Sequence, residues 1–174
     1  MPPPTPAISE KAAEIMDAAE RRIRTSGYQG FSFREIAADV GVKSSSVHHH
    51  FPTKPALAAA VARRYTDRFE AALDNAKSAE DWRAVFRKAL VQHGQMCLCG
   101  VLGAESGDLP PEVSAEARRF FTRNVQALSR LYGSPSAASR QTALRIMATL
   151  EGAMMLARTL DDPKVFDEAT RNLG

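Results

Sequence analysis

Three adjacent histidines and two nearly adjacent cysteines are the residues of this sequence whose types suggest chemistry. His48, His49 and His50 stand in the run GVKSSSVHHHFPTK, and Cys97 and Cys99 flank a single leucine. Imidazole and thiolate groups are common ligands of zinc. Consecutive residues of a helix point about 100° apart, so three adjacent histidines cannot easily close on one ion. Residues that share a helical face lie three or four positions apart, and no other His or Cys has that offset from the run. We therefore expect no metal or other cofactor there.

The cysteines offer a second possible chemistry, that of a reactive thiol. On one helix Cys97 and Cys99 would point about 200° from each other, which disfavours a bridge or a shared metal ion. His93 and Cys97 would share a face, but two ligands alone make a weak metal site. We expect Cys97 to form part of a pocket wall, because a helix C-terminus carries partial negative charge and raises a thiol pKa. The alternative, a thiol-based redox or electrophile sensor using Cys97, stays open.

The elements that must position these residues are almost all helices. Apolar residues recur at the spacing of amphipathic helices, and no segment alternates as a strand does. Ser32 and Glu35 form a capping box that starts a short helix, and Gly41 ends it. The segment CGVLGAESGDLPPE is expected to be a break. We predict an all-α fold with helices over residues 9–25, 32–40, 44–50, 54–73, 81–99, 112–132 and 135–160, and a last helix from Asp162.

Composition and charge restrict the class of protein. The 174 residues are 44% hydrophobic and 25% charged, ordinary values for a globular protein. No apolar run approaches the roughly 20 residues that cross a bilayer, and the start MPPPTPAISE lacks a secretory pattern. We therefore expect a cytoplasmic protein without membrane contact, with a flexible arm over residues 1–8. The net charge is +3, and the first 70 residues hold ten Lys/Arg against eight Asp/Glu. This balance permits a nucleic-acid partner without requiring one.

The segment around the histidines has the layout of a helix-turn-helix. Residues 32–51 comprise a two-turn helix, a glycine turn and a second short helix, which in this motif enters the major groove of DNA. We expect His50 to turn inward beside Phe51. The residues expected to hold the two helices together are Ala37, Val40, Val42, Val47 and Phe51. The predicted DNA-binding residues are Ser32, Arg34, Lys43, Ser44, Ser45, Ser46, His48, His49 and Lys54.

The same stretch resembles the TetR family of bacterial transcriptional repressors. The match runs through IMDAAERRIRTSGYQGFSFREIAADVGVKSSSVHHHFPTKPAL and includes an alanine eight residues before G-Y, S-x-x-E-I-A, G-V and H-F-P-x-K-x-x-L at the family's spacing. Lys43 stands where a capping serine is usual, so Ser44 is predicted to cap the helix instead. Ser45 replaces a usual glycine. His48 and His49 replace an aromatic pair that typically contacts phosphates.

The resemblance implies a domain layout and a function. An arm (1–8) precedes a helix-turn-helix DNA-binding domain (9–55) and a helical domain (56–174) that binds a small molecule and dimerises through its last two long helices. The implied function is that of a homodimeric repressor, bound to a palindromic operator in double-stranded DNA and released by an effector. The segment CLCGVLGAESGDLPPEV is similar to a subgroup of C-terminal domains with a cysteine at the end of the central helix. A helical binding protein that no longer reads DNA is the alternative.

The helix predicted over residues 135–160 carries two apolar stripes. One stripe consists of Ala143, Ile146, Met147, Leu150, Met154 and Ala157. The other consists of Leu144, Ala148, Met155, Leu156 and Leu160. A helix that is apolar on most sides is buried on more than one side. We expect one stripe to face its own domain and the other to face a second copy, since two-fold dimers are the commonest oligomers.

A pocket for an apolar or aromatic effector is expected between the central helices. The candidate ligand-binding residues are Trp82, Phe86, His93, Met96, Cys97, Phe120, Phe121 and Met154. Aromatic and Met side chains at helical spacing are also what an ordinary core contains. The sequence has no evident carboxylate pair, phosphate-binding glycine loop or Ser/His/Asp arrangement, so we do not expect an enzyme.

Overall fold

The fold is helical throughout the part of the chain that the computed structural model describes, which is residues 9–173 without the side chain of His93. These residues form α1 (Glu10–Ser26), the 3-10 turn η1 (Tyr28–Gly30), α2 (Phe33–Val40), α3 (Ser44–His50), α4 (Lys54–Ala72), α5 (Ala79–His93), α6 (Leu98–Ala104), α7 (Pro111–Leu131), α8 (Ala137–Thr159) and α9 (Pro163–Ala169). The predicted all-α class is confirmed. The predicted arm, residues 1–8, lies outside the described residues. None of the described helices is long and apolar enough to span a membrane.

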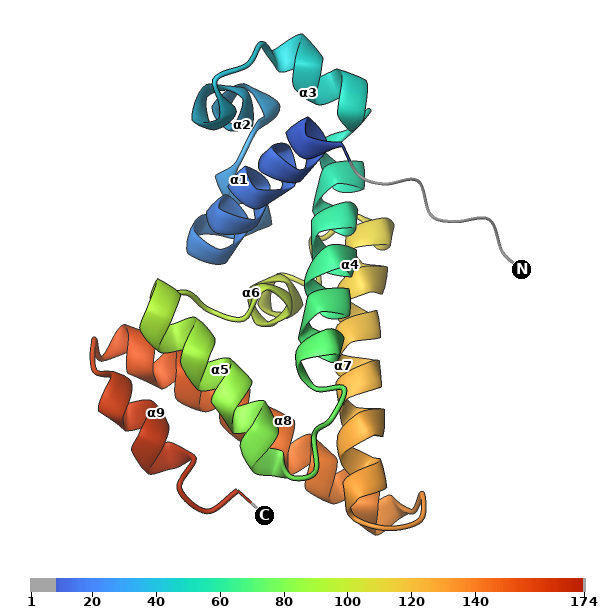
Figure 1. The fold of residues 1–174 in the computed structure, drawn as a ribbon, viewed down its shortest axis with the longest axis vertical. Helices are drawn as coiled ribbons and strands as arrows, with labels where there is room; N and C mark the ends of the chain where they lie inside the picture. The colour runs from blue at the N-terminus through green and yellow to red at the C-terminus, as the bar shows by residue number, and fades with distance from the viewer. Residues whose placement is uncertain (1–8, 174) are drawn as a thin grey trace.

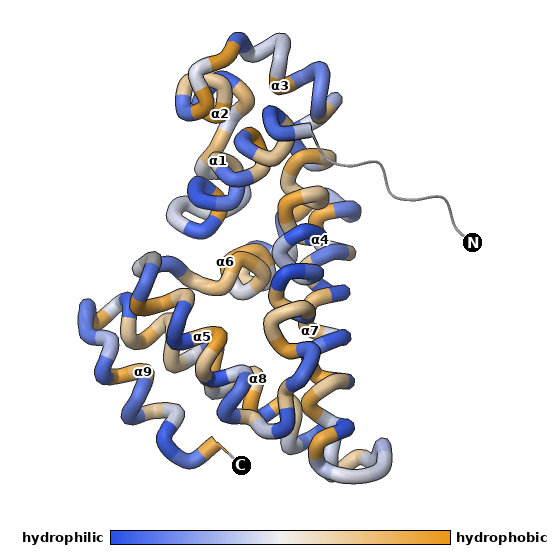
Figure 2. The backbone as a smooth tube through the Cα atoms, viewed as in Figure 1, coloured by the Kyte–Doolittle hydropathy of each residue, from blue (hydrophilic) through white to orange (hydrophobic). Residues whose placement is uncertain are grey.

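The helices form two groups that meet at α6. In Figure 1, α1, α2 and α3 gather at one end of the molecule, α4 and α7 run side by side along its length, and α5, α8 and α9 gather at the other end. The short helix α6 contacts α1, α4 and α7. Figure 2 shows it to be hydrophobic along much of its length, and Leu98, Cys99 and Leu102 are fully buried. The helix α6 therefore connects the C-terminal helices to α1.

Single residues cap the N-terminal helices, and those at the two ends of α2 are the predicted Ser32 and Gly41. Ser9 Oγ accepts the Ala12 N–H at 3.2 Å, and Ser32 Oγ accepts the Glu35 N–H at 3.3 Å. Gly41 ends α2 in the left-handed region, with φ +71°, a conformation that glycine adopts without steric cost. These caps fix the length of α2 at two turns and set the turn that leads into α3.

The start of α3 differs from the prediction in one respect. Ser44 is its first helical residue, as expected, but the N-cap is Lys43, whose side chain makes no capping hydrogen bond. Ser44 therefore does not act as the cap. The inner side of the motif is as predicted: Ala37 and Val47 are buried, and the partly buried residues packed around them include Val40, Val42 and Phe51.

The prediction of one helix over residues 81–99 is wrong. Two helices, α5 and α6, are present instead, and α6 extends to Ala104. Gly94 takes the left-handed conformation, with φ +57°, and ends α5, and its N–H donates to Leu90 O. The chain then restarts as α6 inside the segment expected to be a break. The apolar pattern continues across Gly94 because both helices face the same core, so periodicity alone gave no sign of the interruption. Cys97 thus lies at the N-terminus of α6 instead of at a helix C-terminus.

The two stripes of α8 have different surroundings. All six residues of the first stripe, from Ala143 to Ala157, are buried. In the second stripe Leu144, Met155, Leu156 and Leu160 are 44%, 54%, 45% and 61% exposed. The helix begins later than the predicted residue 135, because its N-cap is Ser136, which accepts the Ser139 N–H at 3.1 Å.

Candidate nucleic-acid interface and effector cavity

One arginine of α1 pairs with two carboxylates of α2. Arg22 Nε and Nη2 donate to the two carboxylate oxygens of Asp39 at 2.6 and 2.9 Å, and Nη1 donates to Glu35 Oε1 at 3.2 Å. The hydrogen bond from Arg22 lowers the pKa of Asp39, and the one from the Ser32 hydroxyl lowers the pKa of Glu35. Exposed ion pairs contribute little stability, but these neutralise two carboxylates beside the helix-turn-helix.

The first turn of α3 is polar and accessible. Ser45 is exposed and Ser44 and Ser46 are half-exposed, whereas Val47 is buried against α2. Lys43, just before the helix, and Arg34 on α2 are also exposed, and neither forms an ion pair within the described part of the chain. Small polar side chains at the start of the second helix can hydrogen-bond to base edges, and nearby unpaired cations can bind phosphates.

The histidine run is spread around the end of α3. The His48 ring packs against Phe33 with centroids 4.6 Å apart, and the His49 and His50 rings lie 5.3 Å from each other. His48 and His49 are exposed, and His50 is the least exposed of the three, as predicted. No group of three or more His, Cys, Asp or Glu side chains suited to a metal ion occurs over residues 9–173 with the His93 side chain left aside.

Two of the predicted DNA-binding residues make contacts within the protein. The Lys54 ammonium lies 4.6 Å from the Tyr28 ring centroid and 4.7 Å from that of Phe31, and burial lowers its pKa. The Ser32 hydroxyl donates to Glu35 Oε2 at 2.9 Å. Both residues hold the domain together, and their contacts with DNA stay predictions.

A cavity of about 910 Å³ lies between α6, α7 and α8. Small-molecule sites occupy roughly 300–1,000 Å³. Glycines of α6 and apolar side chains of α7 and α8 form much of the wall, among them Gly100, Gly103, Phe121, Leu144, Met147 and Met155. The size and lining suit a ligand with an apolar body.

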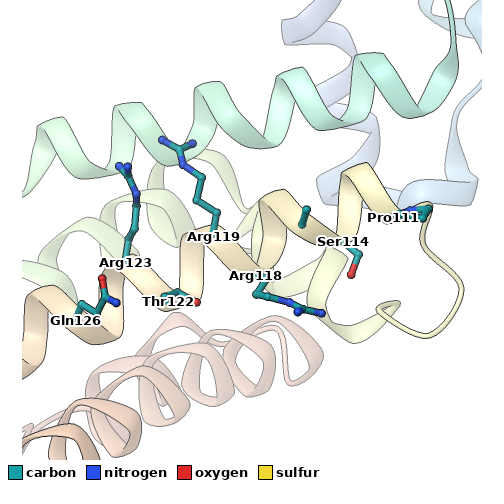
Figure 3. A pocket seen from close by; sticks show the side chains of 8 residues that line it. Pro111, Ser114, Arg118, Arg119, Thr122, Arg123 and Gln126 are labelled. Atoms are coloured by element: carbon teal, nitrogen blue, oxygen red, sulfur yellow. The ribbon is translucent and has the colours of Figure 1, made fainter.

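A neighbouring hollow along α7 is more polar. Figure 3 shows Arg119 and Arg123 extending toward α4, with Arg118 on the other side of α7. Arg119 pairs with Asp67 and Arg123 with Glu70, both at 2.7 Å. Because α4 already engages these two guanidinium groups, the apolar cavity is the better candidate for a ligand site.

Glu151 of α8 places a carboxylate on the wall of the apolar cavity. Both of its oxygens are buried and accept no hydrogen bond from the described residues. Burial raises the pKa of Glu151 to about 7, while the nearby Cys97 thiol acts in the opposite direction. A Cβ at Gly100 would lie 2.3 Å from Glu151 Oε2. The carboxylate therefore fits against the backbone of α6 only because residue 100 has no side chain.

Neither cysteine has the surroundings of a reactive thiol. Cys97 and Cys99 are 1% and 0% exposed. Burial, followed by the charge of Glu151, raises the pKa of both thiols well above the ordinary value. The Gly100 N–H donates to Cys97 Sγ at 3.4 Å and favours the thiolate, but burial outweighs it. The expectation that a helix C-terminus would raise the Cys97 pKa named the wrong cause, because Cys97 lies at a helix N-terminus. His93 and Cys97 do not share a helical face either, because α5 ends between them.

Only part of the predicted ligand set reaches the cavity. Met96 and Phe121 line it, and the side chain of His93 lies outside the described residues. The others fill the core and do not line this cavity: Trp82, Phe86, Cys97, Phe120 and Met154.

The core contacts of this second group are specific. Trp82 Nε1 donates to Asn124 Oδ1 at 2.9 Å, and the Cys97 N–H points to Met154 Sδ at 3.0 Å. The Phe120 and Phe69 rings pack edge to face with centroids 5.0 Å apart. These contacts place Trp82, Phe120 and Met154 in the packed core.

Two hydrogen bonds connect the cavity wall to the N-terminal helices. Arg24 of α1 is 7% exposed, and its Nε donates to Met96 O at 2.7 Å. Glu105, directly after α6, accepts the Tyr28 N–H with Oε1 and Oε2 at 3.2 and 3.0 Å. Met96 and Glu105 both line the cavity, so the residues that flank α6 touch the ligand space on one side and the N-terminal helices on the other.

Comparison with known families assigns both halves of the chain. Residues 15–61 match the family described as bacterial regulatory proteins, tetR family. Residues 76–172, more than half of the chain, match the family described as transcriptional regulator LmrA/YxaF-like, C-terminal domain. The chain belongs to the TetR family. This TetR-family protein is thus a DNA-binding transcription regulator with an N-terminal helix-turn-helix, in which α3 is the second helix of the motif.

Solved TetR-family structures have the same fold. A TetR-family transcriptional regulator from Agrobacterium tumefaciens is 28% identical, with a TM-score of 0.85 over 92% of this chain and 94% of the other. A TetR transcriptional regulator from Legionella pneumophila is 29% identical, with a TM-score of 0.85 over 95% and 96%. The reduced form of E. coli NemR is 20% identical, with a TM-score of 0.77 over 94% and 95%, which indicates the fold alone. No curated protein matches the chain.

Proposed function

We propose that this TetR-family chain is a homodimeric repressor that binds a two-fold symmetric operator and releases it when a small molecule fills the cavity between α6, α7 and α8. The observation that carries the proposal is the pair of hydrogen bonds from the cavity wall to α1 and η1, Arg24 to Met96 O and Tyr28 N–H to Glu105. A site for a ligand and a surface for DNA are thereby joined through one short helix.

The bonds give a route by which a ligand alters α3. A ligand that displaces α6 moves Met96 and Glu105, and with them the acceptors of Arg24 and of the Tyr28 N–H. Since α1 packs against α2 and α3, the helix-turn-helix follows. The two α3 helices of a dimer must fit half-sites about 34 Å apart. A small displacement in each protomer therefore lowers the affinity for the operator.

The exposed stripe of α8 supports the homodimer. Leu156 and Leu160 are 45% and 61% exposed although both are large and apolar, and contiguous exposed apolar surface marks an interaction site. Ala148 and Gly152 line the effector cavity instead, so the dimer contact is assigned to Leu156 and Leu160 near the end of α8. In a two-fold dimer the same patch serves both copies, which suits a self-complementary helix face.

We assign the DNA contacts from the positions of the residues on and next to α2 and α3. Ser44 and Ser45 begin α3, where base edges lie in this motif. Arg34, Lys43, His48 and Ser46 surround them on the same two helices and are assigned to the backbone or to neighbouring bases. Because few cations are involved, the logarithm of the affinity should fall only modestly with the logarithm of the salt concentration, with a slope of about 0.9 per phosphate neutralised.

The test is selection of binding sites from a random duplex library followed by a salt titration. We expect the recovered sequences to share an inverted repeat, and the affinity for it to fall linearly with log salt while exceeding that for mixed DNA. Recovery of no common sequence, with binding equal to that of mixed DNA, would contradict a repressor. It would favour the alternative, a helical small-molecule-binding protein whose helix-turn-helix does not read DNA.

A further inference from the structure

Glu151 is the side chain of the cavity that the fold leaves without a partner. Both carboxylate oxygens are buried and accept no hydrogen bond from residues 9–173. Burying a charged group is costly unless a counter-charge or hydrogen-bond donors compensate it. The apolar wall, including Phe121, Met147 and Met155, supplies neither, and the donor near the carboxylate is the weakly donating thiol of Cys97.

The other charged and titratable groups near Glu151 do not provide the counter-charge. Cys97 and Cys99 face it from the start of α6 and are buried thiols. Glu105 of the wall is a second carboxylate, held by the Tyr28 N–H. Arg118 of α7 lines the cavity, but its side chain is exposed and forms no ion pair with Glu151.

Glycine at position 100 makes room for this carboxylate. A Cβ at Gly100 would lie 2.3 Å from Oε2 and 3.0 Å from Cδ of Glu151. A Cβ at Gly103, one turn later, would lie 3.2 Å from Cε2 of the Phe121 ring. The two glycines therefore leave room on α6 for the Glu151 carboxylate and, one turn later, for the Phe121 ring, and a ring face attracts cations.

We propose that the effector is an organic cation with an apolar body, whose ammonium group binds Glu151 while the body lies against Phe121, Met147 and Met155. The inference rests on the proposed function, since it gives the chemical class of the ligand for that same cavity. A cation supplies the charge and the N–H donors that Glu151 lacks. An anion of the same shape would lie next to a buried carboxylate and be repelled.

The test compares three ligands that share one aromatic body. The protein is titrated, without DNA, with 9-(aminomethyl)anthracene, 9-anthracenemethanol and 9-anthraceneacetate, and binding is followed by fluorescence. A charge-assisted hydrogen bond is worth about 1.5–3 kcal/mol, so the amine should bind about 10- to 100-fold more tightly than the alcohol. Glu151→Gln should lose this preference and keep the affinity for the alcohol. Arg118→Gln, the matched change of the cationic residue on the wall, should keep the preference.

Each other outcome would overturn the proposal. Equal affinity for amine and alcohol, tightest binding of the acetate, no binding of the amine, or a preference that survives Glu151→Gln would each exclude an ammonium site at Glu151. If the preference is lost in Arg118→Gln instead, the charge selectivity comes from α7. Because no DNA is present, these results are separate from site selection. A failed selection with a retained amine preference would refute the repressor and leave the cation site standing.

Discussion

Replacing Glu151 by glutamine should make the ligand-free protein more stable, and more so at high pH. Burial raises the pKa of Glu151 from 4.5 to about 7. The folded state then holds the proton more tightly than the unfolded chain, which binds fewer protons between these pH values. Stability therefore falls as the pH rises through this range. The carboxyl then costs about 1 kcal/mol at pH 5 and about 3 kcal/mol at pH 7 and pH 8.

Glutamine has nearly the shape of glutamate and no charge, so the variant escapes this cost. Urea denaturation of Glu151→Gln and of the unsubstituted protein at pH 5 and pH 8, at one protein concentration, measures the difference. We expect the free energy of unfolding to rise by roughly 2 to 3 kcal/mol more at pH 8 than at pH 5. Glu168→Gln, on the exposed side of α9, is the control and should change little at either pH. An equal change at both pH values, or a less stable variant at pH 8, would refute the burial of an unpartnered carboxylate.

Four further predictions address the DNA surface, the dimer, the coupling and the thiol. Ser45→Leu should select a different operator from a random library, and an unchanged site would place Ser45 away from the bases. Leu156→Glu should sediment as a monomer, because burying an unpaired charge costs several kcal/mol; an intact dimer would move the interface elsewhere. Glu105→Gln should weaken the bond to the Tyr28 N–H, so that the amine lowers operator affinity less than in the unsubstituted protein; an undiminished effect would exclude this route. Mild hypochlorite should leave Cys97 unmodified by intact-protein mass spectrometry, and rapid modification with operator release that Cys97→Ser abolishes would establish the thiol sensor.

Local signals in the sequence were sufficient to predict a helix end where a single residue determines the backbone conformation. Ser32, Gly41 and Asp162 marked the ends of their helices correctly, because capping side chains and left-handed glycines act over only a few residues. The helix-turn-helix could therefore be located from its capping serine and its turn glycine. Gly94 was overlooked, since the apolar pattern on both sides of it points to the same core and hides the break.

The residues that line the cavity were harder to predict, because residue type does not distinguish a packed core from a cavity wall. Trp82, Phe86 and Phe120 were chosen for being aromatic, and they fill the interior. The useful signal was Glu151, an acidic residue within the apolar stretch ATLEGAMMLA of α8. Its significance depends on Gly100, which comes from another helix, and sequence periodicity does not bring the two together.

The most direct test of the repressor is the dependence of operator affinity on the distance between half-sites. A selected inverted repeat and the same duplex with five base pairs inserted at its centre are compared by fluorescence anisotropy at one salt concentration. Half a turn of B-DNA is about 5 base pairs, so the insertion places the second half-site on the opposite face of the duplex. A two-fold dimer with one α3 in each major groove should then bind the altered duplex no better than mixed DNA. Unchanged affinity would show that a single helix-turn-helix carries recognition, and would contradict the homodimeric repressor.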